Sequence, residues 1–359
     1  MQEIVKEIRD VLSEVKYPGT SKSIVALDMV QNIKAEDGKV DFRLVFQKSN
    51  DPFVGAVRKK CESLLKEKLG YTTVEIETVF VHDLEKPLVL EKVKHIVAVS
   101  SGKGGVGKST VASNLAVALA KLGYKVGLVD ADIYGPSMPK MFQVEDARPY
   151  AERIDGRDLI IPVEKYGVKL LSIGFFVDPD QATLWRGGMA SNALKQLIGD
   201  AAWGDLDYFL IDLPPGTSDI HLTVVQTLAM TGAIVVSTPQ AVALADARKG
   251  INMFTNDKVN VPILGLVENM AWFTPAELPE NKYYIFGKEG AKKLAEEMNV
   301  PLLGQIPIVQ SICDNGTPVA LDEDSVTGRA FLSLAASVVR QVDRRNVEMA
   351  PTQIVEMHK

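Results

Sequence analysis

Residues 102–109 read Gly102-Lys103-Gly104-Gly105-Val106-Gly107-Lys108-Ser109, and this stretch decides the fold. It matches the pattern G-x-x-x-x-G-K-S/T, in which glycines let the backbone curl so that successive N–H groups point at phosphate oxygens. An apolar run, Ile96–Val99, precedes the stretch, and a helical pattern, Thr110–Leu122, follows it. Because a phosphate-binding loop stands between a strand and the positive end of a helix, the sequence predicts a P-loop at this position.

Two side chains of the loop are assigned to the phosphates and the metal of Mg-ATP. Lys108 reaches the β- and γ-phosphate oxygens, and the Ser109 hydroxyl binds Mg²⁺. A glycine-rich turn without a ligand is the alternative for the whole stretch. Lys103 is a second lysine in the loop, and taken alone it would be explained as a solvated surface lysine.

A P-loop site also needs a carboxylate at a strand end to hold the metal shell. Asp212 follows the strand-like run Tyr208–Ile211 and precedes Leu213-Pro214-Pro215-Gly216. We assign Asp212 to the metal and the Gly216 amide to the γ-phosphate, which makes this loop sensitive to hydrolysis. A helix cap is the alternative for Asp212.

A second acidic strand end carries Asp130 and Asp132, in the run Asp130-Ala131-Asp132-Ile133-Tyr134-Gly135-Pro136. One of these acids is expected to orient the attacking water. A helix N-cap is the alternative for either residue.

Short apolar runs alternate with helical patterns from His95 onward, which predicts a parallel sheet covered by helices on both faces. The fold class is therefore α/β, a doubly wound, mostly parallel sheet of the P-loop NTPase type, with a small N-terminal α+β domain. The further strand candidates are Lys125–Val129, Lys169–Ile173, Tyr208–Ile211, Ala233–Ser237, Ile263–Val267 and Leu302–Gln305.

The first part of the chain predicts a small α-β-β-α-β domain. A helix over residues 1–15 is followed by strands over Ser23–Ile33 and Val40–Gln47, a helix from Asp51-Pro52 to Gly70, and a strand over Thr72–Val81. We expect this domain at 1–82, a linker at 83–94, the P-loop ATPase domain at 95–345 and a tail at 346–359.

Composition limits the classes of protein. The chain has 359 residues, a net charge of −6 and 46% hydrophobic residues, as in an ordinary globular protein that has no overall charge to attract nucleic acid or an anionic membrane. The N-terminus lacks a signal-peptide pattern and no apolar run is long enough to span a bilayer, so a cytoplasmic protein is expected. Its two cysteines, Cys61 and Cys313, lack the C-x-x-C spacing.

Three motifs together closely resemble the Mrp/ApbC family of deviant-Walker ATPases, which are related to MinD and ParA and carry iron–sulfur clusters. They are Gly102 to Thr110, Asp130-Ala131-Asp132-Ile133-Tyr134-Gly135-Pro136-Ser137, and Asp212-Leu213-Pro214-Pro215-Gly216-Thr217-Ser218-Asp219. The resemblance covers residues 95 to about 340, and the small first domain looks like the N-terminal domain that many members carry.

The resemblance implies a Mg-dependent ATPase that works as a homodimer with ATP between its subunits. Lys103 then matches the lysine that reaches the partner's nucleotide, and Asp132 the acid that activates water. Asn269 and Pro307 match the adenine site, with a turn residue as the alternative for Asn269. The implied nucleotide site is Gly102, Lys103, Gly104, Gly105, Val106, Gly107, Lys108, Ser109, Thr110, Asn269 and Pro307, the implied metal site is Ser109, Asp130 and Asp212, and the implied catalytic residues are Lys103, Lys108 and Asp132.

The chain departs from the family where a cluster would be bound. Members that carry a 4Fe–4S cluster follow the Glu-Asn-Met stretch with a phenylalanine and a C-P-x-C motif, whereas this chain has Phe273-Thr274-Pro275-Ala276-Glu277-Leu278. The usual cysteine is also absent from Lys48-Ser49-Asn50-Asp51-Pro52. Cys61 and Cys313 are explained as small buried hydrophobes, or as one ligand from each subunit completed by exogenous thiols.

The expected function is an ATP-hydrolysing iron–sulfur cluster carrier that delivers clusters to apoprotein clients, without nucleic acid or membrane partners. A nucleotide-gated scaffold that holds no cluster is the alternative, and the missing cysteines favour it. A positioning ATPase of the MinD/ParA type would need a basic amphipathic C-terminal helix or a basic patch, and residues 346–359 have neither. A small-molecule kinase or ligase would need a second substrate pocket that the sequence does not identify.

Overall fold

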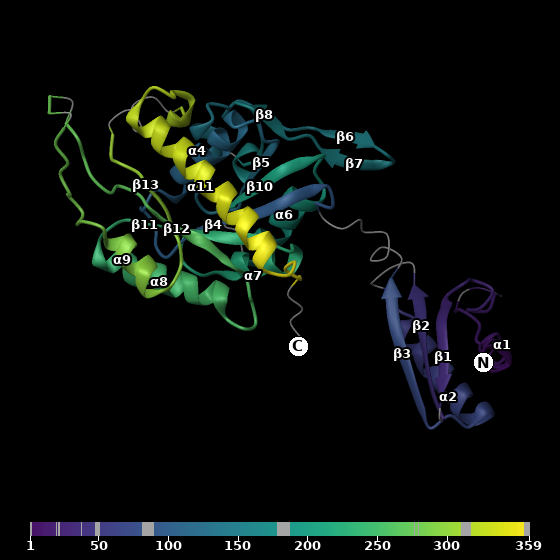
Figure 1. The fold of residues 1–359 in the computed structure, drawn as a ribbon. Coiled ribbons are helices and arrows are strands. Elements are labelled where there is room, and N and C mark those ends of the chain that lie inside the picture. Colours follow the sequence, from purple (N-terminus) through teal and green to yellow (C-terminus); the bar gives the residue numbers. More distant parts are fainter. Residues whose placement is uncertain are drawn as a thin grey trace. The chain divides into compact units, whose positions relative to one another are not determined.

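The computed structural model describes residues 2–18, 20, 22–36, 38–46, 51–80, 90–177, 187–275, 277–278, 280–309 and 317–354. The chain divides into two compact units, Met1–Leu88 and Val89–Lys359 (Figure 1). Within the described ranges, no helix has both the length and the apolar character that crossing a membrane requires.

The first unit is a three-stranded sheet packed on two helices. Strand β1 pairs antiparallel with β2, and β2 pairs parallel with β3. Ile8 and Leu12 of α1 and Cys61 and Leu65 of α2 are buried against the sheet. The elements are α1 (Gln2–Leu12), β1 (Val30–Glu36), β2 (Lys39–Phe46), α2 (Val54–Leu69) and β3 (Thr73–Phe80).

The predicted strand over Ser23–Ile33 is wrong in its first part, because the chain turns there and the strand begins only at Val30. The Ser23 hydroxyl accepts the Ala26 amide at 3.1 Å, the Ser23 carbonyl accepts the Leu27 amide at 3.0 Å, and Asp28 has φ of 54°. Ser23 therefore starts a hydrogen-bonded turn, which a pattern of β-branched residues does not reveal.

The second unit is built on an eight-stranded sheet of order β13-β12-β11-β4-β10-β5-β9-β8. Adjacent strands pair parallel except β8, which pairs antiparallel with β9 at the edge. The predicted doubly wound, mostly parallel sheet is confirmed. Its strands are β4 (Val93–Ser101), β5 (Val126–Asp130), β8 (Val163–Lys165), β9 (Val168–Ser172), β10 (Leu206–Asp212), β11 (Gly232–Ser237), β12 (Ile263–Glu268) and β13 (Leu302–Gln305).

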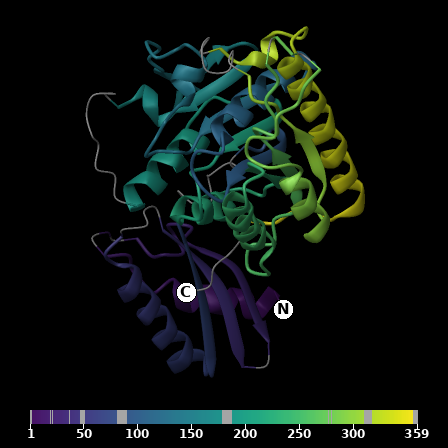
Figure 2. The ribbon, with the colours of Figure 1, turned by 90° about the vertical axis from the view of Figure 1, so that its left-hand side faces the viewer.

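Helices cover both faces of this sheet (Figure 2). On β4, Val97 and Val99 join the core beneath α4 and α11, whereas Ile96 and Ala98 join the core beneath α6 and α7. A parallel strand that is buried on both sides reads as a continuous apolar run, which is why the sequence predicts it well. The helices are α4 (Lys108–Lys121), α5 (Met138–Met141), α6 (Gly187–Gly199), α7 (Asp219–Thr227), α8 (Ala241–Thr255), α9 (Gly290–Glu297) and α11 (Val326–Glu348), with short 3₁₀ turns η1 (Ile173–Phe175) and η2 (Val319–Leu321).

Regular structure extends beyond two of the boundaries expected from the sequence, and one hairpin was not expected. β4 begins at Val93, inside the segment read as a linker, because Val93 pairs with Leu206. α11 continues to Glu348, inside the segment read as a tail, where Glu348 accepts from Arg344 at 2.8 Å. A hairpin of β6 (Ala151–Ile154) and β7 (Arg157–Ile160) was not predicted, since these strands are short and largely exposed.

Candidate nucleotide site

The loop of residues 102–107 lies at the centre of the sheet's carboxyl edge. It follows β4, which lies between β11 and β10, and it leads into α4 at Lys108. Asp212 ends β10 in register with Val99 of β4 and with Asp130 at the end of β5. Because parallel strands end at the same edge, both predicted acidic strand ends lie beside the loop.

Two glycines of the loop are required by close contacts. A Cβ on Gly102 would stand 2.1 Å from the Asp246 carbonyl carbon of α8, so the loop packs directly against a helix backbone. Gly107 has φ of +80°, and a Cβ there would stand 2.2 Å from Asn269 Nδ2. Both positions therefore need glycine for the curled backbone that presents N–H groups to phosphate oxygens.

Lys108, Ser109 and Asp212 form one cluster, in which Lys108 and Asp212 are buried and Ser109 is half-buried. Lys108 Nζ donates to Asp212 Oδ1 at 2.6 Å, and Ser109 Oγ donates to Asp212 Oδ2 at 2.6 Å. Lys108 Nζ also lies 3.1 Å from Ser109 Oγ. Burial raises the pKa of Asp212, while the Lys108 charge and the two hydrogen bonds oppose that rise. The structure thus brings together the predicted phosphate lysine and two of the predicted metal ligands.

The carboxylate of Asp130 is fully buried and is held by four donors. Oδ2 accepts from the amides of Ser137 and Met138 at 3.1 and 3.2 Å and from Ser172 Oγ at 2.9 Å. Oδ1 accepts from the Asp132 amide at 3.2 Å. Burial and the nearby charge of Asp212 raise the pKa of Asp130 to about 7.

Three of these four contacts fall on Oδ2 and one falls on Oδ1. In this arrangement Asp130 anchors the segment that runs from Asp132 to Met138. Its assignment as a metal ligand stays a prediction, to which the geometry adds no support.

Asp132 and Lys103 are the two predicted catalytic residues that are partly exposed. The Asp132 carboxylate accepts backbone hydrogen bonds from Gly135 and Tyr134, and burial raises its pKa above the usual range. Among the residues that the structure describes, Lys103 has no ion-pair partner, and its carbonyl accepts from Ser101 Oγ at 3.0 Å. Neither side chain is held in the cluster around Lys108, which leaves both able to meet a ligand from solvent.

Asn269 clamps the phosphate loop. Its Nδ2 donates to the Val106 carbonyl at 2.8 Å, its own amide donates to the Ser237 carbonyl at 2.8 Å, and its side chain is buried. Pro307 is buried in the neighbouring segment, where the Ile306 amide donates to the Glu268 carbonyl at 2.9 Å. The predicted adenine contacts of Asn269 and Pro307 remain predictions, since in this structure the amide nitrogen of Asn269 faces the loop.

A small hollow lies beside the first turn of α4, next to the phosphate loop. It has a volume of about 180 Å³ and includes Thr110, the residue that follows the predicted metal ligand Ser109. It is lined by Thr110, Ser113, Asn114, Lys140, Met141, Thr317, Pro318 and Val319.

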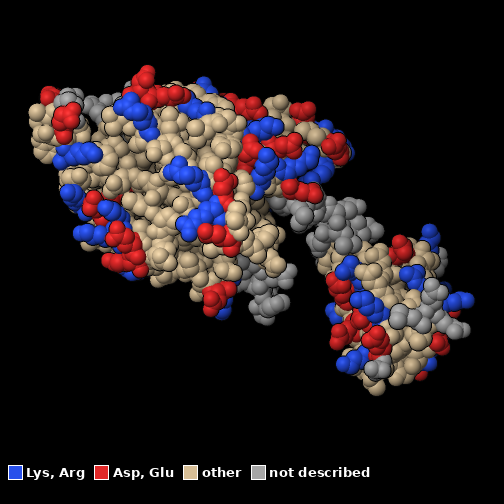
Figure 3. All heavy atoms as spheres, viewed as in Figure 1, with Lys and Arg blue, Asp and Glu red and all other residues tan. Residues whose placement is uncertain are grey.

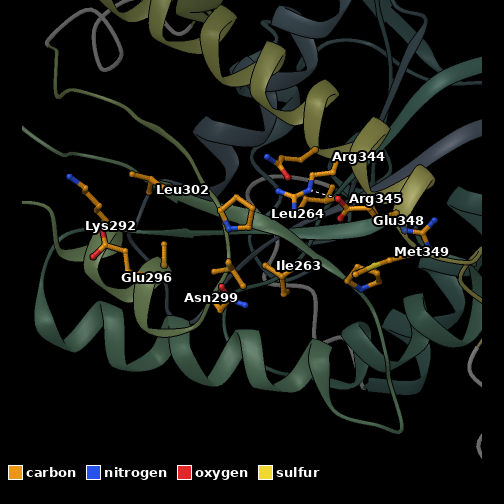
Figure 4. Close-up of a pocket in the computed structure, with 15 residues that line it drawn as sticks. Ile263, Leu264, Lys292, Glu296, Asn299, Leu302, Arg344, Arg345, Glu348 and Met349 are labelled. Atoms are coloured by element: carbon orange, nitrogen blue, oxygen red, sulfur yellow. Dashed lines mark hydrogen bonds and ion pairs between the residues drawn. The ribbon is translucent and has the colours of Figure 1, made fainter.

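A larger hollow of about 620 Å³ lies at the opposite edge of the sheet, where β12 and β13 begin (Figure 4). Its cations are engaged within the protein. Arg344 pairs with Glu348 at 2.8 Å, and Arg345 donates to the Ala350 carbonyl and to Thr352 Oγ1 at 2.8 and 2.7 Å. This hollow lies where β12 and β13 begin, at the edge of the sheet opposite the phosphate loop.

Two buried polar residues near the site were not predicted. Glu268 Oε2 accepts the Ala291 amide in the first turn of α9 at 2.6 Å, and its Oε1 accepts from Gln305 Nε2 at 2.7 Å. His221 lies in the first turn of α7 with 1% of its surface exposed. Glu268 is held by residues from other segments of the chain, and His221 contacts a residue in a turn. The hydrophobic pattern of one strand does not reveal such contacts. Glu268 and Asn269 do follow an apolar run, which is the one signal in the sequence.

Cys61 is a buried thiol of the small unit's core. Its side chain has no exposed surface, and burial raises its pKa to about 12. Cys313 lies outside the described residues. In the part of the chain that the structure describes, no three His, Cys, Asp or Glu side chains are arranged to hold a metal ion.

Charge is mixed over the visible surface. On the face shown in Figure 3, lysine and arginine side chains alternate with aspartate and glutamate over the described residues of both units. This face therefore lacks the single-sign basic surface that backbone binding of nucleic acid uses.

Two family models match the chain. The model described as NUBPL iron-transfer P-loop NTPase matches residues 92–339, and the model described as iron–sulfur cluster assembly protein matches residues 6–78. The first of these covers more than half of the chain.

Curated relatives match over most of its length. An iron–sulfur cluster carrier protein of Synechocystis sp. is 41% identical over 340 residues, which are 92% of this chain and 96% of the relative. A carrier protein of Aquifex aeolicus is 49% identical over 259 residues, 70% of this chain and 69% of the relative. An Arabidopsis thaliana iron–sulfur protein required for mitochondrial NADH dehydrogenase is 48% identical over 258 residues, 70% of this chain and 80% of the relative.

Among solved structures, a nucleotide-binding protein from Archaeoglobus fulgidus in complex with ADP is similar to this chain. It shares 34% identity with a TM-score of 0.54, and the match covers 75% of this chain and 96% of that one.

Proposed function

Because this chain belongs to the family of NUBPL iron-transfer P-loop NTPases, we propose that it is an ATP-hydrolysing carrier that binds iron–sulfur clusters and transfers them to apoproteins. The observation that carries the proposal is the cluster of Lys108, Ser109 and Asp212 beneath a phosphate loop, in a chain whose relatives are named cluster carriers.

The cluster of three side chains suggests how Mg-ATP is bound. Lys108 leaves Asp212 for the β- and γ-phosphate oxygens, so the buried ammonium exchanges one anionic partner for another. Ser109 and Asp212 offer the oxygen donors that Mg²⁺ prefers, and here they are hydrogen-bonded to each other. When bound, the ion neutralises charge that develops on the phosphate oxygens.

Asp132 is proposed to orient the water that attacks the γ-phosphate. Asp132 is partly exposed at the carboxyl edge of the sheet, and its carboxylate accepts hydrogen bonds from the turn amides of Tyr134 and Gly135. The adenine of ATP is proposed to contact Asn269 and Pro307, as the family resemblance implies.

A homodimer with the nucleotide at its interface is also proposed. Several large apolar side chains that come shortly after the carboxyl ends of strands are exposed. A group of exposed apolar side chains is typical of an interaction surface. Lys103 would then reach the partner's nucleotide. These exposed side chains are Tyr134, Phe176, Met189, Leu222 and Val242, of which Tyr134 has 61% and Val242 67% of its surface exposed.

The cluster cargo needs thiolates that Cys61 does not offer in the folded protein. A raised pKa and complete burial keep its sulfur protonated and out of reach. The chain's other cysteine is Cys313. We therefore propose that each subunit supplies Cys313 as one ligand of a shared cluster and that exogenous thiols supply the remaining ligands.

Replacing Cys61 by alanine is expected to leave the number of reactive thiols in the native protein unchanged. The same change should lower the free energy of unfolding by about 1 kcal/mol, since it removes a buried sulfur from the core. Titration with a thiol reagent counts the reactive thiols of the native protein and, after unfolding in guanidinium, all thiols of the chain. A drop in the native count on replacing Cys61 would contradict the burial argument.

Anaerobic reconstitution followed by iron and sulfide analysis tests the proposed function. Parent protein and the Cys61→Ala variant are expected to bind equal amounts of iron and sulfide, whereas Cys313→Ala should lose them. A parent protein that hydrolyses ATP but binds no cluster would instead favour a nucleotide-gated scaffold. That second candidate is favoured by the absence of C-P-x-C and by the burial of Cys61.

A further inference from the structure

The segment that follows Asp212 is anchored upstream on the strand that leads to the phosphate loop. The Leu213 amide donates to the Val99 carbonyl at 3.0 Å, and the Gly216 amide donates to the Ser101 carbonyl at 2.9 Å. Gly216 has φ of +76°, a conformation that suits glycine. The amide that was expected to contact the γ-phosphate is thus bound to the protein here, and nucleotide would have to compete for it.

The same segment is anchored downstream by His221. The Ser218 amide donates to His221 Nδ1 at 3.1 Å, and Ser218 Oγ lies 3.2 Å from the same nitrogen. The His221 amide donates to the Ser218 carbonyl at 3.0 Å, and the two residues form a capping box at the start of α7. A glutamate or glutamine normally supplies the side-chain acceptor of this motif. Here a buried imidazole supplies it, and it holds Ser218, which follows Gly216 closely in the chain.

His221 is held in its neutral form. Burial, together with the charge of Lys108, lowers its pKa to about 4, so Nδ1 keeps its lone pair for the Ser218 amide. Nε2 then carries the proton, yet it is buried without a hydrogen-bond partner among the described residues. An unpaired buried donor costs about 1–3 kcal/mol, so the imidazole is a poor choice for stability alone.

We infer that His221 is a positioning residue for hydrolysis. It holds Ser218 in place, and Ser218 is the downstream pivot about which residues 214–217 move between Ser101 and the γ-phosphate. The inference rests on the proposed ATPase function. It requires no contact of His221 with nucleotide. Because ADP lacks the γ-phosphate, the pivot affects ATP binding and turnover and leaves ADP binding alone.

Three variants test this role against a purely structural one. His221→Ala removes the acceptor, and His221→Gln restores the acceptor that capping boxes normally use. His95→Ala is the matched control, because His95 also has a pKa lowered by burial and a buried Nδ1 without a partner among the described residues. It lies at the amino end of β4, where its ring centroid is 5.1 Å from that of Tyr208.

The readouts are the dissociation constants of ATP and ADP and the kcat for ATP. We expect His221→Ala to bind ADP like the parent, to weaken ATP about tenfold and to lower kcat about tenfold, which corresponds to roughly one lost hydrogen bond at the pivot. His221→Gln should recover both values, and His95→Ala should change neither.

Two results would overturn the inference. One is a His221→Ala protein that keeps the parent's preference for ATP over ADP and its kcat. The other is a His221→Gln protein that folds, binds ADP and shows the same defect as the alanine variant. Failure of the parent to bind ADP at all would instead overturn the proposed function on which the inference rests.

Discussion

Replacing Lys108 by alanine is expected to weaken ATP binding by about a hundredfold or more. Lys108 is the buried ammonium of the loop, and charge-assisted hydrogen bonds to two phosphate oxygens are each worth about 1.5–3 kcal/mol. Calorimetry or a fluorescent ATP analogue measures the affinity. Unchanged affinity in a folded variant would refute the assignment of the phosphate site.

Stability must be separated from binding in this experiment. Lys108 is paired with Asp212, whose side chain has no exposed surface, and removing one partner of a buried ion pair costs about 3–5 kcal/mol of stability. The double variant Lys108→Ala/Asp212→Asn removes the unpaired charge as well. We expect its melting temperature to recover relative to Lys108→Ala while ATP binding stays lost.

Replacing Asp132 by asparagine is expected to keep ATP binding and to lower kcat by about a hundredfold or more, the usual effect of removing a group that orients or deprotonates a nucleophile. Asp132 does not belong to the cluster around Lys108, so nucleotide affinity should change little. Steady-state phosphate release, measured at saturating ATP, gives kcat.

A matched control is Asp146→Asn. Asp146 is an exposed acid that follows α5 in the connection from β5 to β6, and its neutralisation should leave both affinity and kcat as in the parent. Normal turnover in Asp132→Asn would contradict the assigned role, and an equal loss in Asp146→Asn would show that the effect is not specific to Asp132.

The parts of the fold that the sequence predicted are those where one local pattern decides the outcome. The parallel strands read as continuous apolar runs because both faces are buried, and β13 was predicted with the bounds Leu302–Gln305 that it has. The phosphate loop was predicted because glycine spacing, a preceding strand and a following helix all agree. Asp212 was assigned to the metal because a P-loop site needs a carboxylate at a strand end.

The parts that were missed depend on contacts between distant segments or on local turns. The β6–β7 hairpin turns at Asp155 and Gly156, both with positive φ, but its strands are too short and exposed to show a pattern. His221 becomes notable only once burial and the contact to Ser218 are known. The role of Asp130 as an anchor depends on Ser172, which is distant in sequence.

The central claim is tested most directly by cluster transfer. Anaerobically reconstituted protein is mixed with an apoprotein whose activity requires a 4Fe–4S cluster, with an iron chelator present to capture free iron. We predict that activity of the acceptor is restored by the reconstituted parent protein and not by equal amounts of free iron and sulfide. Failure of the parent to restore activity under these conditions, despite binding iron and sulfide, would contradict the carrier function.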